Sequence, residues 1–166
     1  MRKLLFTILA LSLFSCNKIS QLDLQGSWIV DSIQQQEITA NMDSGWKSEM
    51  AASSIFFVGE SLTFNKSSII PCPSAASMVK DYDDYPGYVA YSLSGHTLVI
   101  PEQNYSYYRI DSNGDTSAGQ IIFRALEFEV GIADNEMDLT GKFEETDNLG
   151  NVKRRVKLRI DLSRTK

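Results

Sequence analysis

The sequence predicts an all-β domain: a single antiparallel up-and-down β-barrel of eight or nine strands with one short helix, preceded by a signal peptide. Apolar and polar residues alternate with period two through most of the chain after residue 24, as they do in half-buried strands. The alternating stretches are short and are separated by turn residues such as Ser94-Gly95 and Asp134-Asn135, which is typical of hairpins linked in series. Helical spacing is convincing only in 43–55, where Asp43 or Ser44 could cap a short helix.

The N-terminus has the charge and hydropathy of a secretory signal. Arg2 and Lys3 precede an apolar run over 4–14, which is too short to cross a bilayer as a permanent helix. The run ends in Leu13-Phe14-Ser15-Cys16, which resembles the lipobox of bacterial lipoproteins.

The lipobox resemblance implies a processed and lipidated chain. Residues 1–15 would be removed, Cys16 would carry the fatty acyl chains, 16–23 would form a tether, and 24–166 would form the barrel domain. Outer-membrane attachment follows, on the periplasmic side because no strong acidic run comes after Cys16. The alternative is an ordinary cleaved signal with an incidental cysteine.

The charge of the chain disfavours whole classes of partner. The 16 Lys and Arg residues against 21 Asp and Glu residues give a net charge of −5. Removal of 1–15 takes away two cations and no acid, so the processed chain carries 14 − 21 = −7. This excess of acid disfavours nucleic acid and anionic lipid as the main partner.

Cysteine and histidine content gives no sign of a catalytic or metal site. With Cys16 lipidated, Cys72 would be the only remaining thiol, so no internal disulfide is expected. Cys72 has no basic neighbour to activate it, and His96 is the sole histidine. The 111–117 segment has calcium-loop oxygens but lacks the glycine and glutamate of that motif. We therefore expect no metal, no cofactor and no enzymatic activity.

Three hairpins can be given a register from their alternation and turns. The first predicts the pairs Val89–Ile100, Tyr91–Leu98 and Leu93–His96. The second predicts the pairs Leu126–Phe143, Glu127–Lys142 and Val130–Leu139. The third predicts the pairs Glu144–Lys153 and Asp138–Arg159. The cations of the last strand are thereby interpreted as a solvated face with cross-strand charge pairs.

The first strand of the domain opens with Gly26-Ser27-Trp28, a Gly-x-Trp pattern that resembles the start of lipocalin and lipocalin-like proteins of the Bacteroidota lipoprotein type. In those families the tryptophan closes one end of an up-and-down barrel, and an arginine near the end of the last strand packs across it. Arg164 continues the inward phase of the last strand and is the matching residue. The resemblance implies a barrel base formed by Gly26, Trp28 and Arg164.

Two regions are candidates for binding. The registers place Arg124 opposite Glu145 on the inward phase, with Arg154 diagonal to Glu145, at the strand ends away from Trp28. This trio could bind an amphipathic ligand at the open mouth. The alternative is that the strands extend beyond the core there and the charges are hydrated.

The second candidate region is an acidic, tyrosine-rich loop over 81–88, which contains Tyr82, Tyr85 and Tyr88. Its aromatic residues could contact a protein or a glycan of the envelope, or could pack over the barrel mouth. The sequence therefore leaves two functions open: a binding module for a small apolar or amphipathic ligand, and an interaction module with a barrel filled by its own side chains.

Overall fold

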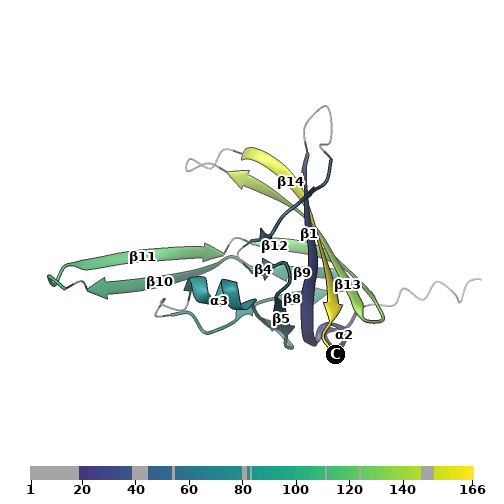
Figure 1. Ribbon diagram of the computed structural model, residues 1–166, viewed down its shortest axis with the longest axis horizontal. Helices are drawn as coiled ribbons and strands as arrows, with labels where there is room; N and C mark the ends of the chain where they lie inside the picture. Colours follow the sequence, from purple (N-terminus) through teal and green to yellow (C-terminus); the bar gives the residue numbers. More distant parts are fainter. Residues whose placement is uncertain are drawn as a thin grey trace, which may run out of the picture.

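The computed structural model describes residues 19–38, 45–53, 55–79, 82, 84–110, 112–123, 125–146 and 152–166 (Figure 1). Most of these residues are in strands, with short helices between them. The elements are α2 (Gln21–Leu24), β1 (Gly26–Ile38), β2 (Lys47–Ser48), β3 (Ala51–Ala52), β4 (Phe56–Phe57), β5 (Ser61–Phe64), β6 (Ser68–Ile70), α3 (Pro73–Val79), β7 (Val89–Ala90), β8 (Ser92–Ser94), β9 (Thr97–Ile100), β10 (Gln103–Ile110), β11 (Thr116–Phe123), β12 (Leu126–Ala133), β13 (Glu136–Thr146) and β14 (Val152–Arg164).

Nine strands form a nearly closed antiparallel barrel in the order β7-β6-β5-β1-β14-β13-β12-β9-β8, which confirms the predicted fold class. The two edge strands, β7 and β8, are separated in the chain by Tyr91 alone. The Tyr91 amide donates a hydrogen bond to the Ser67 carbonyl at 3.0 Å, and its buried side chain donates to the Asn65 carbonyl at 2.6 Å. The chain itself therefore joins the two edges of the sheet.

Of the three predicted registers, the second is confirmed by the Val130–Leu139 pair, and the other two are wrong by two residues. The first hairpin turns through Gly95-His96, where Gly95 has φ of 63°, so Leu93 pairs with Leu98. A two-residue loop with glycine at its first position is a favoured hairpin turn. Tyr91 and Val89 lie before this ladder, and Val89 pairs instead with Ile69 of β6.

In the third hairpin, Glu144 pairs with Arg155 and Thr140 with Arg159. The shift of one residue between Glu145 and Thr146 accounts for half of this difference. The Arg155 Nε lies 2.6 Å from a Glu144 carboxylate oxygen, with both side chains exposed. A slip of two residues keeps every side chain on its predicted face. The predicted exposed outer face of the last strand is therefore confirmed, and Glu144–Arg155 is an ion pair across the strands. The rest of the predicted cross-strand charge pairing is not: Lys142 lies opposite Lys157, and Arg159 pairs with Asp161 on its own strand at 2.9 Å.

The barrel interior is packed with apolar side chains from nearly every strand. Two edge-to-face aromatic pairs lie within it, Phe64 with Tyr91 at 5.6 Å and Phe56 with Phe128 at 6.0 Å between ring centroids. Phe56 belongs to β4, outside the barrel sheet, and is 0% exposed. The fully buried large side chains are Trp28, Phe56, Phe64, Phe128, Leu24, Ile33, Ile55, Leu62, Ile69, Leu98 and Ile100.

The helix predicted over 43–55 is wrong for the part of it that the structure describes, which contains β2 and β3. Trp46 and Met50, which are spaced as on one side of a helix, are 46% and 74% exposed. Ser53 has φ of 55°, a left-handed conformation that cannot continue an α-helix. Over so short a segment, apolar spacing does not separate a helix from two brief strands.

Helix α3 lies between β6 and β7 and was not predicted from the sequence. It starts with Pro73 at a position where the missing amide hydrogen costs nothing. The Glu60 carboxylate accepts hydrogen bonds from the amide and the hydroxyl of Ser74, and these bonds lower the Glu60 pKa. The helix buries Ala75 and Val79 against the barrel core.

Candidate functional site

The closed end of the barrel is formed by the predicted tryptophan and arginine. Trp28 is fully buried, and its indole nitrogen donates a hydrogen bond of 2.8 Å to the Leu24 carbonyl in α2. The Arg164 guanidinium carbon lies 4.5 Å from the centroid of the Trp28 ring. Arg164 also donates to the carbonyl oxygens of Gln25 at 3.0 Å and Asp23 at 2.8 Å. One side chain thus stacks on the indole and holds α2 across the end of the barrel.

Gly26 is required by the same arrangement. Its φ of 126° is a conformation that L side chains rarely adopt. A Cβ atom at this position would lie 3.1 Å from Nη1 of Arg164. A glycine at this position therefore allows the backbone turn from α2 into β1. It also leaves room for the Arg164 guanidinium.

At the opposite end of the barrel, the mouth, the strand positions that continue the inward face carry polar residues. Gln35 pairs with Leu158 and with Lys47, and Glu37 pairs with Val156, so these three polar residues continue the phase of buried aliphatic residues. Lys47 is exposed, and Gln35 and Glu37 are half-buried. The strands therefore extend beyond the core here. This agrees with the alternative that the inward charges at the mouth are hydrated.

The predicted trio at the mouth is only partly described. Glu145 pairs directly with Arg154, where a diagonal relation was expected, because the register differs by two residues. Arg154 is exposed. Arg124 and the side chain of Glu145 lie outside what the structure describes.

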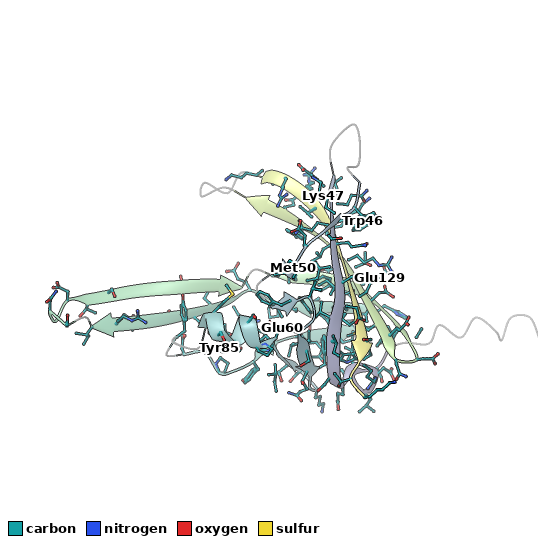
Figure 2. The ribbon with its side chains drawn as sticks, viewed as in Figure 1. Trp46, Lys47, Met50, Glu60, Tyr85 and Glu129 are labelled. Carbon is teal, nitrogen blue, oxygen red and sulfur yellow. The ribbon has the colours of Figure 1, made fainter. Side chains whose placement is uncertain are left out.

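The tyrosine-rich loop packs against the rest of the protein in its described part. Tyr82 and Tyr85 are half-buried against the core cluster, whereas Tyr88 is 44% exposed. The rings of Tyr85 and Tyr105 meet edge to face at 5.0 Å between centroids. Figure 2 places Tyr85 close to α3 and the start of β10. Two of the three predicted contact residues therefore support the fold locally.

Tyr85 provides a test of this packing. Its hydroxyl is buried without a hydrogen-bond partner among the described residues, and burial raises its pKa from 10.0 to about 12. The folded protein thus loses stability as the pH rises from 10 toward 12, because the unfolded chain releases the proton first. Tyr85→Phe should be neutral or stabilising by about 1 kcal/mol near pH 8, since it removes an unsatisfied polar group.

The variant should also lose less stability than the wild type between about pH 8 and about pH 11. Urea unfolding of both proteins at the two pH values measures the difference. Equal losses of unfolding free energy in the two proteins would contradict the burial of this hydroxyl.

A two-stranded ribbon of β10 and β11, here called the arm, projects sideways from the barrel between β9 and β12 (Figure 1). Its root is fixed by polar contacts. The Ala90 amide of β7 donates to Gln103 Oε1 at 2.8 Å, the Tyr105 hydroxyl donates to Gln103 Oε1 at 3.1 Å, and the Ser106 amide donates to Asp84 Oδ1 at 2.7 Å. The tyrosine-rich loop and β7 therefore hold the arm at its base.

The outer part of the arm is exposed. Tyr108 pairs with Ala118 and Ile110 with Thr116, so the four residues share one face, and all are exposed. Tyr108 and Ile110 are each 70% exposed. Among the residues that the structure describes, β11 pairs with β10 alone.

The arm is the feature that sequence reasoning missed. The structure pairs Gln103–Ile110 with Thr116–Phe123, and neither segment belongs to the three hairpins predicted from the sequence. The signal was present in the turn over 112–114, which is followed by a stretch rich in β-branched and aromatic residues. Alternation alone could not show that this hairpin lies outside the barrel.

Cys72 lies within the hydrophobic core. It is fully buried, and this burial, with a smaller contribution from Glu60, raises the pKa of its thiol. A raised thiol pKa disfavours the reactive thiolate, which agrees with the structural interpretation of this residue.

Within the described ranges, no group of three or more His, Cys, Asp or Glu side chains is placed to hold a metal ion. The same ranges contain no helix that is long and apolar enough to span a membrane. The barrel is compatible with the lipocalin-like fold that the Gly-x-Trp pattern resembles. Comparison with known protein families, curated proteins and solved structures finds no match to this chain.

Proposed function

We propose that this protein is a lipid-anchored, non-catalytic interaction module of the cell envelope, and that its arm binds a protein partner by adding a strand to β11. The observation that carries the proposal is the combination of a barrel interior occupied by large apolar side chains with a projecting ribbon, in which β11 pairs with β10 alone among the described strands. Attachment to the outer membrane, on its periplasmic side, rests on the lipobox-like sequence that ends at Cys16.

The filled interior argues against the barrel as the main binding site. Ligand pockets usually combine apolar walls with a few convergent polar groups that orient the ligand. Among the described residues no polar or charged side chain is classed as buried, and the interior holds Phe56 from outside the sheet. A barrel of about eight strands can be filled by its own side chains or can hold one small ligand. Here the buried rings of Phe56, Phe64 and Phe128 lie in the interior and favour the first case.

The edge of β11 is better suited to strand addition than that of β10. The Asp84 side chain already occupies the Ser106 amide on β10. Exposed edge strands usually carry lysine, proline or other charged residues that prevent pairing. The eight residues of β11 include no charged residue and no proline. In strand addition the main chain provides affinity, and side chains such as Tyr108 and Ile110 would provide selectivity.

An isolated two-stranded ribbon is marginally stable in water, and a third strand is normally needed. A partner segment paired with β11 would supply this third strand. The exposed face that contains Tyr108, Ile110 and Ala118 would then gain an apolar neighbour, as expected of a binding surface rich in aromatic residues.

The proposal is tested by capture in cells with a photo-crosslinking residue in place of Ser117, which is exposed on β11. We expect one discrete protein adduct. In the same protein, Ala118→Lys with Gln120→Lys should abolish the adduct, because edge lysines oppose pairing. Glu129→Lys is the matched control, since it changes the net charge by the same amount on β12, a strand paired on both sides.

The control should retain the adduct, and the thermal midpoints of all variants should remain close to that of the wild type. An adduct that survives the double lysine substitution would overturn strand addition at β11. An adduct whose mass is twice that of the chain would replace the outside partner with a second copy.

A small amphipathic ligand at the mouth is the second candidate function. It is favoured by Trp46, a large exposed apolar residue beside the cation Lys47, and by the exposed Met50 further along the same segment (Figure 2). An anionic headgroup could contact Lys47 or Arg154 while its apolar part covers Trp46. Binding of this kind should quench or shift the fluorescence of Trp46, and Trp46→Phe should remove that signal.

A further inference from the structure

The closed end of the barrel is connected to the lipidation site by a very short segment. Ser20 and Asp23 form a capping box at the start of α2, with the Ser20 amide 2.7 Å from an Asp23 carboxylate oxygen. Ile19 already packs against the hydrophobic core. The structure describes the expected tether over 16–23 from Ile19 onward, and in the sequence Asn17 and Lys18 lie between Cys16 and Ile19.

We propose that the closed end of the barrel, formed by Ile19, α2 and the turn at Asp134-Asn135, lies against the membrane surface. This inference rests on the proposed lipidation of Cys16. Three Cα-to-Cα steps separate Cys16 from Ile19, and a fully extended chain covers about 11 Å in that number of steps. The acyl chains would therefore hold Ile19, and with it the packed core, within about 11 Å of the lipid headgroups.

The contacts that fix α2 make this orientation rigid. Arg164 donates to the Asp23 and Gln25 carbonyls, and the Arg164 amide donates to the Asn135 carbonyl at 2.8 Å. The start of β1, the end of β14 and the β12–β13 turn are therefore joined at this end. Leu22, which is 74% exposed on α2, offers an apolar side chain to the headgroup region.

The strand ends and turns on this side of the barrel carry charges of both signs: Asp23, Asp134 and Glu136 are acidic, and Lys66, Arg164 and Lys166 are basic. Attraction to anionic lipid therefore contributes little, and the acyl chains provide the attachment. The short tether then determines which end of the barrel faces the lipid.

The arm and the mouth would both stand away from the bilayer. β12 runs from Leu126, beside the root of the arm, to Ala133 at the closed end, and seven strand steps cover roughly 24 Å before the tilt of the strand is counted. The exposed edge of β11 would lie at about this height, where a partner in the aqueous space can reach it.

The test uses the lipidated protein in phosphatidylcholine vesicles that contain a headgroup-attached nitroxide quencher. Fluorophores are placed one at a time at Asn135→Cys, Ser112→Cys and Lys153→Cys, which are exposed positions at the closed end, the arm tip and the mouth. Cys72 is buried and should not react. We expect severalfold stronger quenching at residue 135 than at residues 112 and 153.

A control variant carries a flexible Gly-Ser insert of about twelve residues after Asn17, with an end-to-end distance of about 20 Å. It should remain bound to the vesicles and lose most of the difference in quenching. Equal quenching at the three positions of the parent protein, or stronger quenching at residue 112 or 153, would overturn the orientation while leaving lipidation intact. A wild-type protein that is found without acyl mass and does not bind vesicles would instead overturn the proposed anchoring, and the orientation with it.

Discussion

Trp28→Ala is expected to lower the free energy of unfolding by about 3–5 kcal/mol, the range for truncation of a large buried aromatic residue. The indole is 0% exposed and donates a hydrogen bond to the Leu24 carbonyl. Its loss leaves a cavity at the closed end, an unpaired carbonyl and an Arg164 side chain without its stacking surface. Urea denaturation followed by circular dichroism measures the change.

Trp46→Ala is the matched control, because the second tryptophan is 46% exposed at the other end of the barrel. Its expected effect is within about 0.5 kcal/mol, as for most surface substitutions. Similar losses for the two substitutions would mean that the closed end does not depend on the stacked indole and guanidinium.

Phe56→Ala should produce a loss of similar size, about 3–5 kcal/mol. Phe56 comes from β4, outside the barrel sheet, and its ring meets Phe128 of β12 edge to face inside the core. If the residue fills the barrel permanently, its removal creates a cavity whose lining loses contacts. If it were a movable cover over a ligand site, the side chain could be truncated at little cost in stability.

Phe57→Ala is the control, since the neighbouring ring is only half-buried on the same short strand. We expect a clearly smaller loss of stability than for Phe56→Ala, measured by the same urea titration. An equal or smaller loss for Phe56→Ala would contradict a permanently filled interior.

The barrel and its closed end were predictable because each depends on local and directional patterns. Period-two alternation identifies the inward face of each strand, and it does so even when the pairing slips by two residues. This is why the inward phase of Arg164 was predicted although the β13–β14 register was wrong. Its contact with Trp28 was what the lipocalin resemblance implied. The shift in that register occurs at Glu145, where alternation carries no signal.

The filling of the barrel and the arm were not predictable in the same way. Phe56 enters the core from a short segment between strands, so its burial depends on the space left by the assembled barrel. Thr116–Phe123 has no charged residue and ends in three large apolar residues, yet it forms an edge strand of the arm outside the barrel. Whether such a strand joins a barrel depends on the neighbours available after folding, which the sequence of one strand does not specify.

The central claim is that the barrel is filled by its own side chains and that binding takes place outside it. Native mass spectrometry of the protein extracted from its own membrane tests this claim most directly. We predict a mass equal to the processed chain with its acyl groups, in repeated extractions by different mild detergents. A stoichiometric small molecule that is released only when the barrel unfolds would contradict it.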